Sequence, residues 1–134
     1  MTEPDRASAV EVVKAAMDAF ARGDVEEMSA YVHPDADIEM VGLGGEIVHG
    51  VDGLRDALAV AGARAHRPTM SSVEPVGDDG AMMIGRVRYG DPSGAVWDSP
   101  AVWLSIVRDG MIWRTRAFGS VDEAREAYPS LTAS

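Results

Sequence analysis

The C-terminal half of the sequence contains three strand-like runs divided by two strong turn signals, and this pattern constrains the fold more than any other feature. The runs cover residues 81–89, 95–108 and 111–118. Residues 90–94 (GDPSG) combine the residue types that favour turns, and Asp109-Gly110 is a dipeptide typical of tight hairpins. Strands joined by such short connections pair antiparallel. The sequence therefore predicts an antiparallel meander from residue 81 to residue 118.

Helical periodicity characterises the N-terminal half. Within residues 7–22, apolar residues recur at the spacing of one helix face: Val10, Val13, Met17 and Phe20. A second helix is expected at 24–31, and it must end before Pro34 because the residue preceding a proline avoids the helical region. The other expected elements are short strands at 37–41, 46–49 and 69–75, a third helix after Gly50 and a final helix at 121–128.

Helices followed by an antiparallel sheet are typical of the α+β class. The length of 134 residues corresponds to one domain of ordinary size, and no repeat or linker divides the chain. A chain of this length buries roughly two-thirds of its unfolded surface, which is enough for one hydrophobic core. We therefore expect residues 1–134 to form a single α+β domain.

Charge and composition limit the partners. The formal net charge is −10, and a field of this sign repels phosphate backbones and anionic lipids. Neither a nucleic-acid nor a membrane partner is expected, and the absence of a long apolar run or a signal-like N-terminus favours a cytoplasmic location. The chain has no cysteine, which excludes thiol chemistry. Its three histidines lack metal-ligand spacing, so neither a metal nor a cofactor is predicted.

The run at 101–107 is apolar on both faces of the expected strand. A strand with one wet face should alternate between apolar and polar residues. We expect the helices of so short a chain to cover only one face of the sheet, so the other face should meet a second subunit. We therefore expect a homodimer through the face that carries Val102, Leu104, Ile106 and Phe118. The alternative is a monomer whose sheet tolerates scattered surface apolar residues.

A series of short motifs resembles the SnoaL-like branch of the nuclear transport factor 2-like superfamily. In order, they are Phe20-x-x-Gly23-Asp24, the segment YVHPDA at 31–36, His49-Gly50 before a helix, the segment 103–112 and the segment FGSVDEA at 118–124. The resemblance covers nearly the whole chain. It implies a cone-shaped, curved sheet wrapped around the N-terminal helices, with a cavity that often binds apolar or polycyclic ligands. Function on a shared scaffold must still be argued from the site.

Positions that are catalytic in related enzymes hold other residues here. Ketosteroid-isomerase-like proteins use an aspartate on the first strand, a tyrosine on the first helix and a second acid on the long strand. The matching residues are Met40, Ala16 and Trp103. Polyketide cyclases and epoxide hydrolases of this fold use an aspartate on the last strand, which matches Ala117. The resemblance thus implies a scaffold without these inherited mechanisms.

Strand pairing offers a second way to locate the site. If residues 91–94 form a four-residue loop, Gly90 pairs with Ala95, and Arg86 then pairs with Ser99. Directly paired residues share a face, so the pairing predicts Arg86 and Arg88 on the same face as Trp103. The resemblance implies that Arg86 and Trp103 line the cavity, which makes this the cavity face. The expected ligand-binding residues are Arg86, Arg88, Trp97, Ser99, Trp103, Met40, Phe20, Ala16, Thr115 and Ala117.

Arginines beside tryptophans favour an aromatic or polycyclic ligand that carries a carbonyl group or a negative charge. Arg86 and Arg88 are the only catalytic candidates, through electrostatic stabilisation, and no proton acceptor accompanies them. If the protein is an enzyme, we expect a cofactor-independent isomerase, cyclase or hydrolase. The alternative is a non-catalytic binding or accessory protein, in which the arginines pair with surface acids. Asp98 is expected on the face opposite the pocket, and His33 and His49 are interpreted as structural turn residues.

Overall fold

The computed structural model describes residues 8–39, 47–63, 67–90 and 93–133, which form helices and strands in alternating blocks. The helices are α1 (Ala9–Ala21), α2 (Val25–Ser29), α3 (Gly50–Ala63) and α4 (Val121–Thr132). The strands are β1 (Val32–Glu39), β2 (Ile47–His49), β3 (Arg67–Val76), β4 (Gly80–Gly90), β5 (Val96–Arg108) and β6 (Met111–Phe118). The expected order of elements along the chain is confirmed.

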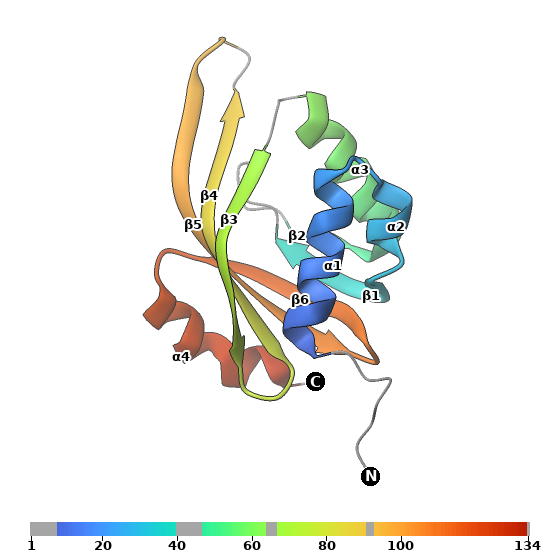
Figure 1. The fold of residues 1–134 in the computed structure, drawn as a ribbon, viewed down its shortest axis with the longest axis vertical. Helices are drawn as coiled ribbons and strands as arrows, with labels where there is room; N and C mark the ends of the chain where they lie inside the picture. Colours follow the sequence, from blue (N-terminus) through green and yellow to red (C-terminus); the bar gives the residue numbers. More distant parts are fainter. Residues whose placement is uncertain (1–7, 40–46, 64–66, 91–92, 134) are drawn as a thin grey trace.

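The strands form one curved sheet in the order β2-β1-β6-β5-β4-β3. From β3 to β6 each strand pairs antiparallel with the next, which confirms the expected meander, while β1 runs parallel to β6. Figure 1 shows α1, α2 and α3 together on one side of the sheet and α4 on the other. We call the side that faces α1 the inner face and the side that faces α4 the outer face. The fold is of the α+β class, as expected.

Strand β1 begins earlier in the chain than the sequence suggested. It starts at Val32 and includes Pro34, where a turn was expected. The pairing of β1 with β6 is irregular between Val32 and Asp37. Proline lacks an N–H group and is tolerated in a strand at such irregularities. Residues 40–46, which contain the end of the expected first strand and the following turn, lie outside the described part of the chain.

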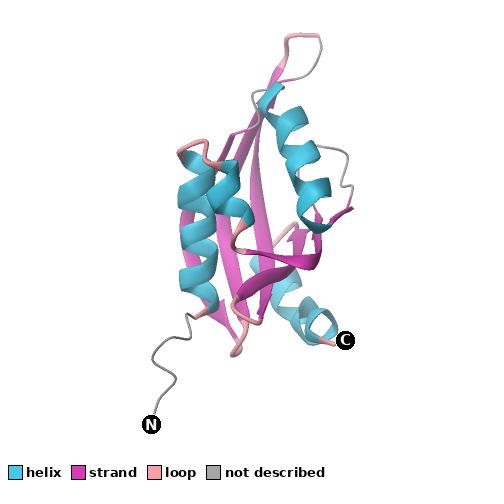
Figure 2. Cartoon of the chain, turned by 90° about the vertical axis from the view of Figure 1, so that its right-hand side faces the viewer, coloured by secondary structure: helices cyan, strands magenta, loops and turns pink. Residues whose placement is uncertain are grey.

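Helix α1 packs its small residues against the inner face. Ser8 caps the helix: its Oγ accepts a hydrogen bond from the Glu11 N–H at 3.1 Å, and the Glu11 carboxylate accepts one from the Ser8 N–H at 3.3 Å. This reciprocal arrangement satisfies two N–H groups that a helix start leaves unpaired. Ala16 and Ala19 are fully buried and allow the helix to approach the strands closely. In Figure 2, which looks onto the helical side, α1 and α3 stand in front of the strands.

Helix α4 covers much of the outer face. Met82, Leu104 and Ile106 are fully buried in a cluster that includes residues of this helix. The expectation that helices cover only one face of the sheet is therefore wrong, because α4 folds back across the opposite face after the last strand. The apolar character of both faces of β5 is thus explained within a single chain. The surface expected to meet a second subunit is instead packed against α4, and it contains Val102, Leu104, Ile106 and Phe118.

Two arginines attach the end of α4 to the sheet. The guanidinium groups of Arg108 and Arg114 lie 3.5 Å and 4.0 Å from the centre of the Trp113 ring, within the range of a cation–π contact. The same groups donate hydrogen bonds of 3.0–3.3 Å to carbonyl oxygens at the C-terminal end of α4. Carbonyls at a helix C-terminus lack helical partners and attract positive charge. Both arginines therefore stabilise the docked position of α4.

Tyr128 attaches the middle of α4 to the hairpin between β3 and β4. Its hydroxyl group donates a 2.5 Å hydrogen bond to Asp79 Oδ1. The Tyr128 side chain lies very close to Gly77 and Gly80. A Cβ atom at Gly77 would come within 2.0 Å of the hydroxyl oxygen, and one at Gly80 within 3.0 Å of the ring. The hydrogen bond to Asp79, followed by partial burial, raises the pKa of Tyr128 above its ordinary value.

Candidate functional site

The inner face is the surface that the helices and the sheet enclose together. In the described ranges, its positions on β1 and β3–β6 hold no Asp, Glu, His, Lys or Arg. Trp103 is its largest described side chain on the central strands and is 7% exposed. The face is not covered evenly, because Met70, Ser99 and Ala117 remain partly exposed. Solvent thus reaches an inner surface that is mainly apolar.

The register between β4 and β5 differs by one residue from the expected one. Gly90 pairs with Val96 rather than with Ala95. A shift of one residue reverses the face assigned to every side chain on the partner strand. Trp103 is consequently paired with Met83, and both residues belong to the core cluster beneath α1.

Both candidate arginines lie on the outer face as a result. Arg86 pairs with Pro100, and Arg88 pairs with Asp98. Arg86 Nε donates to Asp98 Oδ1 at 2.8 Å, and more than half of each side chain in this ion pair is exposed. The expectation that the arginines share a face with Trp103 is therefore wrong. Asp98 lies on the face opposite Trp103, as expected, and Arg86 pairs with this surface acid, which was the alternative to a role in the pocket.

The other expected site residues differ in burial, and two of their side chains are not described. On the inner side, Ala16 and Thr115 are buried, Phe20 and Ala117 pack partly buried against the core cluster, and Ser99 is partly exposed. Position 97 lies in β5, but the Trp97 side chain is outside the described part, as is Met40. The ligand-binding roles of these residues stay predictions.

Two buried hydroxyl groups form a hydrogen-bonded pair on the otherwise mainly apolar inner face. Ser105 of β5 and Thr115 of β6 are directly paired, and their side-chain oxygens lie 2.8 Å apart in a hydrogen bond. Ser105 is fully buried and Thr115 is 6% exposed. The sequence suggested Thr115 but not Ser105. The sequence did indicate that Ser105 is unusual, because it is the one polar residue in the apolar run at 101–107.

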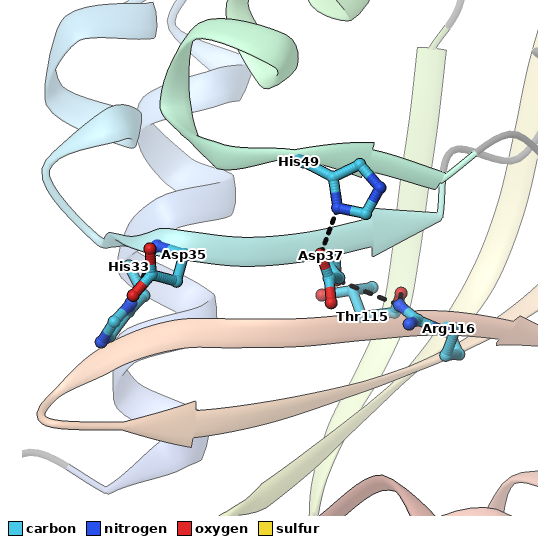
Figure 3. A network of polar contacts seen from close by, with 6 residues as sticks. All are labelled: His33, Asp35, Asp37, His49, Thr115 and Arg116. Atoms are coloured by element: carbon cyan, nitrogen blue, oxygen red, sulfur yellow. Dashed lines mark hydrogen bonds and ion pairs between the residues drawn. The ribbon is translucent and has the colours of Figure 1, made fainter. Parts of the chain in front are cut away.

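A separate polar network lies on the outer face of β1, β2 and β6, as Figure 3 shows. His49 Nδ1 contacts Asp37 Oδ1, which links β2 to β1. Arg116 Nη1 donates to the main-chain oxygen of Asp37 at 3.1 Å and to that of Thr115 at 3.0 Å. His49 is 77% exposed in its side chain. This network braces the edge of the sheet and does not reach the inner face.

His33 also has structural contacts. Its Nδ1 accepts a 3.0 Å hydrogen bond from the Asp35 N–H, and its Nε2 lies 3.6 Å from Asp109 Oδ2. These contacts tie the start of β1 to the hairpin between β5 and β6. His33 lies within β1 rather than in the expected turn, and its structural role stays a prediction. Among the residues that the structure places, no three acidic or histidine side chains converge as metal ligands. No helix within the described ranges has the length and apolar character needed to cross a bilayer.

The fold is a curved six-stranded sheet with α1, α2 and α3 on its inner face and α4 on its outer face. The sequence matches the SnoaL-like domain family over residues 13–115. The chain therefore belongs to the SnoaL-like family, as its motifs indicated. No curated protein matches the sequence.

Solved structures with the same fold share little sequence with this chain. A nuclear transport factor 2-like protein from Burkholderia thailandensis is 18% identical, with a TM-score of 0.75 over 88% of this chain and 97% of its own. The Δ5-3-ketosteroid isomerase from Mycobacterium sp. is 22% identical, with a TM-score of 0.68 over 87% and 96%. A Mycobacterium tuberculosis protein in complex with estradiol-17β-hemisuccinate is 17% identical, with a TM-score of 0.71 over 87% and 97%. These likenesses establish the fold.

Proposed function

We propose that this protein binds a neutral, largely apolar, ring-containing small molecule between its helices and the inner face of the sheet. The observation that carries the proposal is the chemistry of that face: a tryptophan, small residues and a few hydroxyl groups, with no charged side chain in the described part. Such a lining suits an apolar ligand that a few polar groups orient. A similar fold has been solved in complex with estradiol-17β-hemisuccinate, which supports a ligand with a largely apolar ring system.

A binding or accessory role fits this surface better than proton-transfer catalysis. An isomerase or cyclase needs a group that accepts a proton within hydrogen-bonding reach of the substrate. The described inner positions offer no carboxylate or imidazole for that role. We therefore expect no enzyme-dependent turnover of a Δ5-ketosteroid or of limonene epoxide. Turnover of either substrate would show that the protein is an enzyme and that the proposal is wrong.

A ligand panel tests the binding proposal. Methyl esters of aromatic acids should bind more tightly than the corresponding carboxylates, because burying a carboxylate without a partner is costly. Tryptophan fluorescence and thermal shift report binding. Ala117→Leu should weaken binding by filling the inner face, whereas Arg86→Met on the outer face should leave it unchanged. Tighter binding of the carboxylates, or equal effects of the two substitutions, would contradict the proposal.

We propose further that the protein is a cytoplasmic homodimer with no nucleic-acid partner. The net charge of −10 disfavours contact with phosphate backbones. The part of the outer face beyond α4 carries the exposed Arg86, Arg88 and Asp98, and a two-fold contact would bring acidic and basic groups of the two copies together. Sedimentation at micromolar concentration should give twice the chain mass, and Arg88→Glu should shift the protein toward monomer. Monomeric wild-type protein at that concentration would refute this arrangement.

A further inference from the structure

We infer that the free edge of the sheet along β3 is closed to strand addition by its own backbone. Pro68, Pro75 and an extra residue at Ser71 together prevent a second copy of the chain from extending the sheet. This edge block governs which surfaces can join two copies, and it does not depend on the proposed ligand.

Strand β3 offers the longest free edge of the described sheet. It lies at one end of the strand order, and no described strand pairs with it on the side away from β4. It has ten residues, whereas β2 at the opposite end has three. Thr69, Ser71 and Ser72 on this edge are exposed. A long, accessible edge presents unpaired N–H and C=O groups, on which another chain can add a strand.

Two prolines remove hydrogen-bond donors from this edge. Pro68 pairs with Val87 of β4, and Pro75 pairs with Ala81. These two partners are an even number of residues apart, and the hydrogen-bonding direction alternates along a strand, so both proline nitrogens point to the same side of β3. A proline ring directed at β4 would push that strand away, yet the pairing continues on both sides of each proline. Both nitrogens therefore point to the free side, where a CH₂ group replaces each N–H group.

An extra residue interrupts the edge between the two prolines. Met70 pairs with Gly85 and Ser72 pairs with Ile84, so Ser71 has no partner on β4. Such a bulge disrupts the ladder and increases the local twist of the strand. A regular strand from another molecule cannot stay in register with this edge along its length.

The other free stretches of the sheet carry related features. In the described part, β5 pairs with β6 only from Val102 onward, which leaves residues 96–101 with a neighbour on β4 alone. Pro100 lies in this stretch and is exposed, and β2 is short. Prolines, bulges and short strands are the means by which natural sheets avoid pairing at their edges. Two copies of this chain are therefore left with the faces of their sheets as contact surfaces.

A variant with an open edge tests the edge block. Pro68→Thr/Pro75→Thr combined with deletion of Ser71 restores the N–H groups and a regular ladder, and threonine favours strands without adding a large apolar group. Sedimentation at micromolar concentration should give this variant at least twice the mass of the wild type. Hydrogen exchange should show slow amides between residues 69 and 74 in the associated form, because pairing protects the N–H groups that face an added strand.

A matched control separates the backbone from strand propensity. Ser71→Thr/Ser72→Thr raises the strand propensity of the same stretch but keeps both prolines and the extra residue, so it should keep the wild-type mass. Far-UV circular dichroism and thermal unfolding show whether each variant is folded. If deletion of Ser71 prevents folding, Pro68→Thr/Pro75→Thr alone carries the test and should associate more strongly than the wild type.

Four results would overturn the edge block. A folded open-edge variant with the wild-type mass would show that the prolines and the bulge do not prevent pairing. Association that leaves the amides of residues 69–74 in fast exchange would place the new contact elsewhere. Equal association of the threonine control would assign the effect to strand propensity. Unfolding of Pro68→Thr/Pro75→Thr would mean that the prolines are required by the fold itself.

Discussion

Replacing Tyr128 by phenylalanine tests how firmly α4 is attached to the sheet. The substitution removes only the hydroxyl group that donates to Asp79 Oδ1 at 2.5 Å and keeps the ring against Gly77 and Gly80. A hydrogen bond to a charged group contributes roughly 1.5–3 kcal/mol, and partial exposure of this one favours the lower end. We therefore expect the free energy of unfolding at pH 7 to fall by about 1.5 kcal/mol and the Tm by about 5 °C. Urea unfolding followed by far-UV circular dichroism measures the difference.

The pH dependence of that difference identifies its cause. Because the hydrogen bond to Asp79 raises the pKa of Tyr128 above its ordinary value of 10.0, the folded state favours the neutral phenol. The stabilisation is present below pH 10, and it is lost as the pH rises through the pKa of the folded state. The gap between wild type and Tyr128→Phe should therefore be constant from pH 7 to 9 and shrink above pH 10. A variant as stable as the wild type at pH 7, or a gap that persists at high pH, would refute this account.

Three further predictions concern the strands. Ser105→Ala and Thr115→Val should each lower the free energy of unfolding by about 1–3 kcal/mol, because each leaves a buried hydroxyl without a partner, while the double variant should unfold almost as the wild type does. Denaturant titration of the wild type, both single variants and the double variant measures these differences, and a double-variant loss equal to the sum of the two single losses would contradict the prediction. Gly85→Ala should destabilise the protein by about 1–3 kcal/mol or more, since its Cβ would lie 2.0 Å from the Thr69 carbonyl oxygen, and an unchanged melting temperature would contradict the strand geometry. Arg86→Met should cost less than about 1 kcal/mol, because the ion pair it breaks is exposed, and a larger loss would mean that this pair supports the core.

Turn chemistry made part of the fold predictable. Asp109 and Gly110 both adopt positive φ angles, 57° and 76°, which is the geometry that a two-residue hairpin requires and that this dipeptide favours. The expected strand on its C-terminal side, 111–118, therefore coincides with β6. Here the residue types determine both the presence of the turn and its length.

The turn between β4 and β5 shows where the same reasoning fails. Glycine, proline and aspartate at 90–94 indicate that the chain reverses, but they leave open whether four or five residues separate the paired positions. Gly90 pairs with Val96, so five residues intervene. Because side chains alternate between the two faces with a period of two, a loop predicted one residue too short placed Arg86 and Arg88 on the wrong face. The predicted site therefore depended on the length of the loop between β4 and β5, which the residue types in the loop do not determine.

Burial of the hydroxyl pair could be anticipated only in part. Ser105 interrupts an apolar run, which indicates a buried polar group that needs a partner. The partner itself depends on the register of β5 with β6, which shifts between Ile106 and Val107. The residues around Ile106 and Val107 do not indicate that the register shifts there. Motif resemblance identified the family because the motifs mark turns and helix ends, and these positions do not depend on register.

The cover of the outer face by α4 also has a consequence for synthesis of the chain. Helix α4 follows all six strands, so the ribosome delivers the strip formed by Leu104, Ile106 and Met82 before the helix that buries it. During that interval the sheet presents an apolar surface, and nascent chains with such surfaces are prone to aggregate. A chain terminated after residue 120 would keep this surface open permanently. We expect its soluble yield to depend on chaperones, whereas the full chain should become independent of them once α4 has docked.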